Sequence, residues 1–275
     1  MFNVEAHGAS IPALGFGVFR MSNVEVERIV PEALSVGFRH FDTAQIYGNE
    51  AALGLALEKA GAKRDDLFLT TKVWVENYAP ERFAASVDES LDKLKVDQVD
   101  LLLLHWPGDK VAIPQQIEML DAVQAAGRTR HIGVSNQNIA QMTETARLSK
   151  VPIVTNQVEN HPYIDQTKLH AAARDAGIAL TAYYGMADGK VISDPAIQAI
   201  AARYGKTPAQ VVLRWLVQQD GMIALSKTAK VSRVAENFAI FDFALEAEDM
   251  AALHALARAD GRIVSPAGLA PEWDR

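Results

Sequence analysis

Short apolar runs alternate with amphipathic segments along almost the whole chain, and this alternation most restricts the folds open to it. Strands of a parallel sheet that are buried on both faces read as continuous apolar runs. Eight runs have this character, at residues 14–18, 39–41, 67–72, 99–105, 131–134, 153–156, 179–183 and 222–225. Strands that alternate with helices are typical of parallel βαβ units.

Helical patterns lie between these runs. They fall at residues 24–36, 49–60, 80–94, 114–126, 138–148 and 166–176, with a pair at 194–204 and 207–218 before the last strand. Eight strands alternating with helices predict an α/β fold, the (β/α)8 or TIM barrel. No linker rich in proline, glycine or serine divides the 275 residues, so we expect one domain over residues 1–275.

The two ends of the chain predict additions to this barrel. Residues 3–5 and 10–12 read as an N-terminal β-hairpin, and residues 246–258 as a C-terminal helix that precedes an irregular tail at 264–275. Pro31 falls inside the first predicted helix, where a proline removes a hydrogen bond, so we expect it to kink or divide that helix.

Four ionisable side chains stand at or just beyond the carboxyl ends of three successive apolar runs. Asp42 and Tyr47 follow the run at 39–41, Lys72 closes the next run, and His105 closes the one after it. Because the carboxyl ends of barrel strands converge on one mouth, where such barrels keep their chemistry, we expect these four side chains to meet there.

These residue types fit the reduction of a carbonyl group, which needs a hydride at carbon and a proton at oxygen, and no metal. Tyrosine is a weak acid with an ordinary pKa near ~10, but a neighbouring ammonium favours tyrosinate. Tyr47 would then be the acid, with Lys72 beside it and Asp42 holding the ammonium. A neutral His105 would donate a hydrogen bond that orients the carbonyl.

The motifs around these residues resemble those of the aldo-keto reductase family. HFDTA holds Asp42, QIYGNE holds Tyr47, LTTKVW holds Lys72 and LLLHWP holds His105. The resemblance runs almost end to end and implies that these four residues are catalytic. Within the family the chain is similar to bacterial reductases of small dicarbonyls and keto sugars, such as methylglyoxal and 2,5-diketogluconate, and residues 264–274 carry that likeness.

The resemblance also implies a site for NADPH. Ser135, Asn136 and Gln157 match the residues that bond the nicotinamide amide, and Tyr183 matches the aromatic residue that stacks on the ring. The segment SKTAKVSRVAEN matches the residues that grip the 2′-phosphate and adenine, namely Lys227, Thr228, Arg233, Glu236 and Asn237. Cations before a helix suit a phosphate. Tyr184-Gly185-Met186 replaces the family's Ser-Pro-Leu, which puts side-chain contacts to the pyrophosphate in question.

Several aromatic residues are candidates for the substrate pocket. Phe19, Trp74 and Trp106 follow predicted strands and could either line the pocket or belong to the core. Trp273 in the tail could either cover the mouth or pack on a helix. Gly15 and Gly17 lack the third glycine of a dinucleotide fingerprint, so we interpret them as sites of tight packing.

Composition restricts the partners of the chain. A net charge of −7 and a pI near 5.5 argue against nucleic acid, and the absence of cysteine excludes disulfides, thiolate metal sites and cysteine nucleophiles. The N-terminus lacks the pattern of a signal peptide, and no apolar run approaches membrane-spanning length. We therefore expect a cytoplasmic protein that binds a small-molecule carbonyl substrate and neither nucleic acid nor membrane. No pattern in the sequence encodes an oligomeric state, and we expect a monomer.

Two other functions stay open on the sequence alone. Lys72 could form a Schiff base with a carbonyl substrate, as in lyases built on barrels. The chain could also be a non-catalytic sensor that binds NADPH. Borohydride trapping of Lys72 would support the lyase, and a turnover assay with NADPH would separate the reductase from the sensor.

Overall fold

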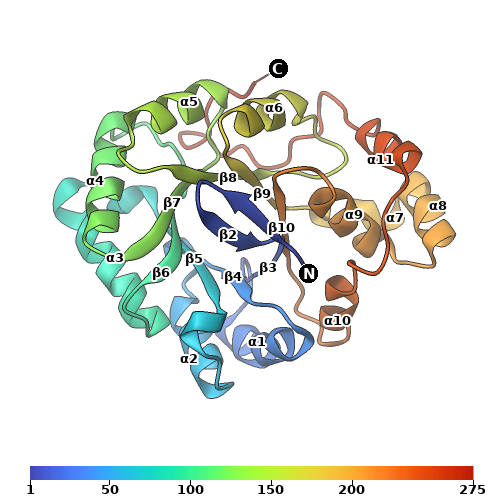
Figure 1. The fold of residues 1–275 in the computed structure, drawn as a ribbon, viewed down its shortest axis with the longest axis horizontal. Coiled ribbons are helices and arrows are strands. Elements are labelled where there is room, and N and C mark those ends of the chain that lie inside the picture. Colours follow the sequence, from blue (N-terminus) through green and yellow to red (C-terminus); the bar gives the residue numbers. More distant parts are fainter. Residues whose placement is uncertain (275) are drawn as a thin grey trace.

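Eight parallel strands close into a barrel in the order β10-β3-β4-β5-β6-β7-β8-β9 (Figure 1). The structure is a computed structural model that describes residues 1–274. The strands are β3 (Leu14–Gly17), β4 (His40–Asp42), β5 (Phe68–Val73), β6 (Val99–Leu104), β7 (Thr129–Ser135), β8 (Ile153–Glu159), β9 (Ala179–Tyr183) and β10 (Met222–Ser226). Each predicted run overlaps one of these strands, so the predicted (β/α)8 barrel is confirmed.

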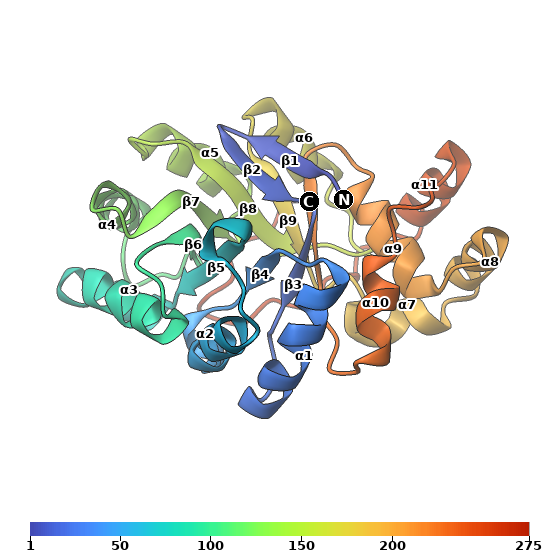
Figure 2. The same ribbon diagram turned by 60° about the horizontal axis from the view of Figure 1, so that its bottom comes forward.

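Helices surround the barrel on its outer face (Figures 1 and 2). They are α1 (Asn23–Val36), α2 (Glu50–Lys59), α3 (Pro80–Leu94), α4 (Ile113–Ala125), α5 (Ile139–Leu148), α6 (Thr167–Asp175), α7 (Lys190–Ser193), α8 (Pro195–Tyr204), α9 (Pro208–Val217), α10 (Ser232–Phe238) and α11 (Ala247–His254). The amphipathic patterns predicted all of these except the short α7 and α10. Their apolar faces pack on the strands and form one continuous core.

The structure departs from two expectations about where the helices begin, break or end. Pro31 does not divide α1, which runs unbroken from Asn23 to Val36. A proline removes only one backbone donor, and Ile29, Val30 and Ala33 keep both halves of the helix buried against the core. The C-terminal helix ends at His254 rather than at Arg258, because the N–H of Arg258 donates to the carbonyl of Tyr163 instead of continuing the helix.

The N-terminal hairpin lies across one end of the barrel, where both views show it (Figures 1 and 2). It pairs β1 (Asn3–Ala6) with β2 (Ala9–Pro12), as predicted. The ring of His7 lies 2.9 Å from the carbonyl of Ala176, in the connection that leads into β9. The hairpin therefore covers the amino ends of the strands and leaves the carboxyl ends free for a site.

One of the two early glycines is a site of close packing, as predicted. A Cβ on Gly15 would lie 2.7 Å from Nδ1 of His40 and 2.8 Å from a methyl group of Leu225. At Gly17 a Cβ would make only ordinary contacts, and this residue lines the cavity described below.

Candidate active site

A cavity of about 520 Å³ opens at the carboxyl ends of the barrel strands. Asp42 is the last residue of β4, Tyr47 ends a short 3-10 helix (Gln45–Tyr47), and His105 follows β6; all three line the cavity. Lys72, near the end of β5, is fully buried behind them. The barrel therefore brings together the four side chains that the sequence placed at strand ends.

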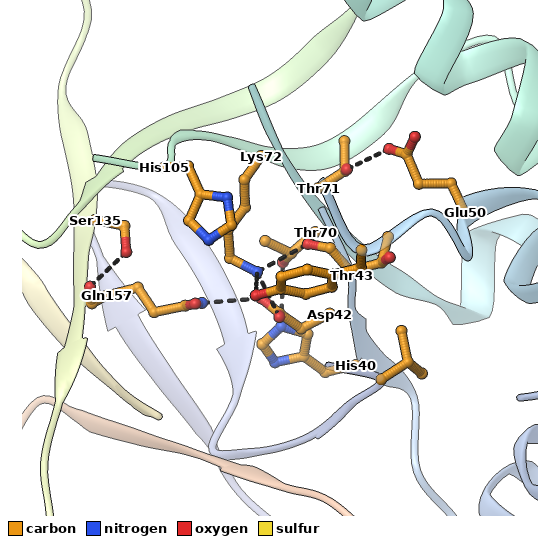
Figure 3. A network of polar contacts seen from close by, with 12 residues as sticks. His40, Asp42, Thr43, Glu50, Thr70, Thr71, Lys72, His105, Ser135 and Gln157 are labelled. Atoms are coloured by element: carbon orange, nitrogen blue, oxygen red, sulfur yellow. Dashed lines mark hydrogen bonds and ion pairs between the residues drawn. The ribbon is translucent and has the colours of Figure 1, made fainter. Parts of the chain in front are cut away.

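The ammonium of Lys72 donates all three of its hydrogens to neighbouring oxygen atoms of the site (Figure 3). Its Nζ donates to Oδ1 of Asp42 at 2.6 Å and to the carbonyl of Thr43 at 2.8 Å. The third hydrogen bond goes to the hydroxyl oxygen of Tyr47 at 3.4 Å. Because that oxygen accepts from Lys72, the hydroxyl proton of Tyr47 is left for another acceptor.

Asp42 is held on both of its oxygens. Oδ1 pairs with Lys72, and Oδ2 accepts a hydrogen bond of 2.8 Å from the side-chain amide of Gln157 (Figure 3). Gln157 is expected at the cofactor, and its contact with Asp42 was not predicted from the sequence. Gln157 therefore also fixes the carboxylate that orients Lys72.

The pKa of Tyr47 departs from the expectation. We expected Lys72 to lower it, but burial of the hydroxyl among these groups raises the pKa well above its ordinary value of 10.0, and the charge of Asp42 adds to the effect. Burial has the opposite effect on Lys72: it lowers the pKa of the ammonium, while the charge of Asp42 opposes that shift. Tyr47 therefore carries its proton at neutral pH.

His105 is a neutral imidazole. Burial, followed by the charge of Lys72, lowers its pKa well below the ordinary value of 6.5. Its ring lies edge-on to the rings of Tyr47 and Trp74, with centroids 5.6 Å and 5.3 Å away. Nδ1 is buried and has no hydrogen-bond partner within residues 1–274. The imidazole is therefore positioned mainly by packing and can present a ring nitrogen to the cavity.

Buried histidines make the stability of the fold depend on pH. Burial lowers the pKa of His40, with Asp42 acting in the opposite direction, and burial also lowers that of His105. Both titrate near 6.5 in the unfolded chain, so below that pH the folded state binds fewer protons. The stability they contribute is complete above about pH 6.5 and is lost as the pH falls below it.

We therefore expect the free energy of unfolding to decline from about pH 7 to about pH 5, by at most about 1.4 kcal/mol per pH unit for each histidine. Urea unfolding at both pH values measures the decline. In His40→Gln it should be shallower than in the wild type; an equal decline in the two proteins would show that His40 does not contribute.

The residues expected at a nicotinamide lie together on the cavity wall. Ser135 ends β7, Asn136 follows it, and Tyr183 ends β9. The hydroxyl of Ser135 donates to the carbonyl of Gln157 at 2.7 Å, and the hydroxyl of Tyr183 donates to the side-chain oxygen of Asn136 at 2.6 Å. Asn136 has a φ of 62°, a left-handed conformation that asparagine tolerates better than most residues.

The residues expected at the adenosine end are only partly on the cavity. Lys227 and Asn237 line it, whereas Thr228, Arg233 and Glu236 do not. Oδ1 of Asn237 is buried and lacks a donor within the described chain. The carboxylate of Glu236 accepts from the hydroxyl of Thr207 at 3.0 Å. Arg233 is exposed on α10, and its guanidinium makes no hydrogen bond or ion pair with residues 1–274.

Sequence reasoning missed part of the rim. Arg20 donates to the hydroxyl of Tyr184 at 2.9 Å and lies 3.8 Å from the carboxylate of Asp188. These three residues line the cavity and have positive φ angles, which are uncommon outside glycine. The position of Arg20 just beyond β3 follows the strand-end rule that identified the first four residues, but nothing local in the sequence predicts its contacts with 184–188.

The predicted pocket aromatics separate into two groups. Phe19, Trp74 and Trp106 line the cavity. Trp273 is absent from its lining and instead packs near Trp106, with ring centroids 6.4 Å apart. Other apolar residues also line the cavity, among them Ile46, Met186 and Val264.

The chain belongs to the aldo-keto reductase family: the family model described as "Aldo/keto reductase family" matches residues 13–258. Members of this family are oxidoreductases that act on carbonyl groups with nicotinamide cofactors. This chain is therefore an oxidoreductase of the same kind. The methylglyoxal reductase DkgB of Escherichia coli O157:H7 is 42% identical over 268 residues, which are 96% of this chain and 100% of that protein.

Solved structures show the same relationship. A protein provisionally designated 2,5-diketo-D-gluconic acid reductase B superposes with a TM-score of 0.99 at 62% identity, over 100% of this chain and 98% of its own. The aldose reductase of Schistosoma japonicum superposes with a TM-score of 0.88 at 32% identity, over 94% of each chain. No helix in residues 1–274 has the length and apolar character to cross a membrane.

Proposed function

We propose that this chain uses NADPH to reduce small aldehydes, 1,2-dicarbonyls or keto sugars to alcohols, with Tyr47 as the general acid. The hydrogen-bond pattern of Lys72 carries the proposal: the tyrosine oxygen accepts from Lys72, so its own proton is free for a carbonyl oxygen in the cavity. Relatives named for methylglyoxal and 2,5-diketogluconate support this substrate range.

The proton step follows from the geometry. When bound, the nicotinamide would supply a hydride to the carbonyl carbon. Tyr47 donates its proton to the carbonyl oxygen, and the raised pKa ensures that the proton is present before the step. The ammonium of Lys72, 3.4 Å from the phenol oxygen, stabilises the tyrosinate that remains. Asp42 and Gln157 hold that ammonium in place.

His105 would orient the substrate. As a neutral imidazole it can donate a hydrogen bond to the same carbonyl oxygen without giving up a proton at neutral pH. Its packing between Tyr47 and Trp74 keeps the ring beside the acid.

The described residues fit NADPH at both ends of the cavity. Ser135, Asn136, Gln157 and Tyr183 surround the place for the nicotinamide beside the acid.

The buried Oδ1 of Asn237, which lacks a donor, suits the amino group of an adenine. Thr228, Arg233 and Glu236 would serve the adenosine half from outside the cavity lining. Lys227 and Arg233 are exposed cations at the end of β10 and on α10, where a 2′-phosphate would meet them.

The cavity favours small substrates. Its wall near Tyr47 is formed by Phe19, Ile46, Trp74 and Trp106. The connection that joins β6 to α4 is short, so no long loop encloses a large ligand there. An adjacent carbonyl makes the reacting carbon more electrophilic, which helps a loosely enclosed site.

A spectrophotometric assay of NADPH oxidation tests the proposal. We expect kcat/KM for methylglyoxal to exceed that for acetone by orders of magnitude, with 2,5-diketogluconate also reduced. Efficient reduction of a bulky steroid ketone would contradict the assignment to small substrates. Absence of turnover with every aldehyde and diketone in the panel would contradict the reductase itself.

The alternatives that the sequence left open are disfavoured. A Schiff base needs an unprotonated amine that can reach the substrate, whereas Lys72 is fully buried, ion-paired with Asp42 and outside the cavity lining. A sensor that only binds NADPH would not need the arrangement of Tyr47 and Lys72, and the named relatives are reductases.

Arg233 tests the cofactor assignment separately from the acid. Arg233→Ala should weaken NADPH binding by about one to two decades and leave NADH binding unchanged, because only NADPH carries the 2′-phosphate and a charge-assisted hydrogen bond contributes roughly 1.5 to 3 kcal/mol. Fluorescence titration with both cofactors measures the two Kd values. Arg147→Ala is the control, since Arg147 is an exposed arginine on α5. Equal loss for both cofactors would place Arg233 outside the phosphate site.

A further inference from the structure

A buried carboxylate, Glu159, ends β8 two residues beyond Gln157 and takes no part in the proposed proton transfer. Its side chain is 0% exposed. Burying a carboxylate is costly unless it is paired and hydrogen-bonded, so its partners indicate why it is tolerated.

Most of these partners come from the C-terminal tail, defined here as residues 261–274. Glu159 accepts hydrogen bonds from the backbone N–H groups of Ile263 at 2.7 Å and Val264 at 2.9 Å. The guanidinium of Arg262 lies 3.7 Å from the same carboxylate. The ring of His161, at 2.9 Å, is the fourth partner and the one that lies close in sequence. Three of the four partners are therefore about a hundred residues away.

The tail needs such an acceptor because residues 261–266 form neither helix nor strand. Backbone N–H groups in such a segment must find partners elsewhere or be solvated. The tail starts at Gly261, which packs tightly against Tyr163: a Cβ on Gly261 would lie 1.7 Å from the carbonyl oxygen of Tyr163. It ends beside α5, where Asn138 donates to the carbonyl of Glu272 at 2.9 Å (Figure 1). Glu159 holds the stretch between these two points.

The stretch that Glu159 holds forms part of the pocket. Val264 lines the cavity directly. The guanidinium of Arg262 stacks on the ring of Trp273, 3.6 Å from its centroid, and Trp273 in turn packs near Trp106, which lines the cavity. A shift of residues 262–264 would therefore move one wall residue and loosen the support of another.

We propose that Glu159 is a positioning residue for the substrate side of the pocket, which fixes the tail by accepting the N–H groups of Ile263 and Val264. This proposal rests on the proposed function only in taking the cavity as the site of carbonyl reduction. It assigns Glu159 no contact with substrate or cofactor. Its effect reaches the substrate through Val264 and through the pair of Trp273 and Trp106.

Glu159→Gln tests the proposal, because an amide nitrogen cannot accept the second backbone N–H. In the variant, KM for methylglyoxal should rise about tenfold, the scale of losing a hydrogen bond to a charged group. The kcat and the Kd for NADPH should change less than about threefold, because the acid and the cofactor residues are untouched. Amide exchange at residues 263 and 264 should accelerate at least about tenfold, since local opening governs it.

A double-mutant cycle with Val264→Ala shows whether the effect passes through the tail. We expect Glu159→Gln to raise KM less in the Val264→Ala protein than in the wild type, because the two residues share one route to the substrate. Glu118→Gln, an exposed change on α4, is the control and should alter none of these quantities. Should Glu159→Gln fail to fold, Glu159→Asp keeps the charge and should raise KM by a smaller factor.

Two results would overturn the proposal. An unchanged KM despite faster exchange in the tail would show that the tail does not shape the pocket. Equal losses in kcat and NADPH affinity, with unchanged exchange at 263 and 264, would show that Glu159 acts through its strand neighbour Tyr183 instead. If the wild type did not reduce methylglyoxal, the proposed function would fail, and the exchange rates would still decide whether Glu159 holds the tail.

Discussion

Tyr47→Phe should lower kcat for carbonyl reduction by at least about 100-fold, which is the lower range of positioned acid catalysis. The change removes the transferable proton, while the phenyl ring keeps its packing against Phe19 and His105. The Kd for NADPH should stay nearly constant, because Tyr47 is not among the residues expected to hold the cofactor. Steady-state kinetics and fluorescence titration give the two quantities.

Tyr204→Phe serves as the matched control. Its hydroxyl, on α8, bonds with Asp249 and with the N–H of Glu246, away from the cavity. The control should leave kcat unchanged even if it costs some stability. Retention of more than about a tenth of wild-type kcat in Tyr47→Phe would remove Tyr47 from the role of acid.

Lys72→Met should reduce kcat by a similar factor and also destabilise the fold. The ammonium no longer supports the tyrosinate, and Asp42 is left buried without its counter-ion. Breaking a buried pair from one side typically costs about 3 to 5 kcal/mol. Urea unfolding, together with kcat measured at a temperature where the variant is folded, separates the two effects.

The double variant Asp42→Asn/Lys72→Met distinguishes stability from chemistry. Neutralising Asp42 removes the uncompensated charge, so the double variant should be more stable than Lys72→Met alone. Its kcat should stay as low as that of the single variant. Efficient reduction by Lys72→Met with only a raised KM would instead make the lysine a binding residue and the proposed mechanism wrong.

The sequence by itself determined the barrel and the meeting of its four ionisable residues. Both follow from local patterns: apolar runs of strand length set the alternation, and the parallel topology brings every strand's carboxyl end to one mouth. Asp42, Lys72 and His105 needed no knowledge of distant contacts, because each stands at or next to the end of its own strand.

Only the tertiary structure decided how those residues behave. The direction of the pKa shift at Tyr47 depends on how much water the folded site excludes, because burial is the largest cause of the rise and the charge of Asp42 adds to it. The amide of Gln157 reaches Asp42 across 115 residues, and Glu159 reaches the tail across 104. Such contacts leave no periodic or local trace in a sequence, because they form between surfaces that only the closed barrel brings together.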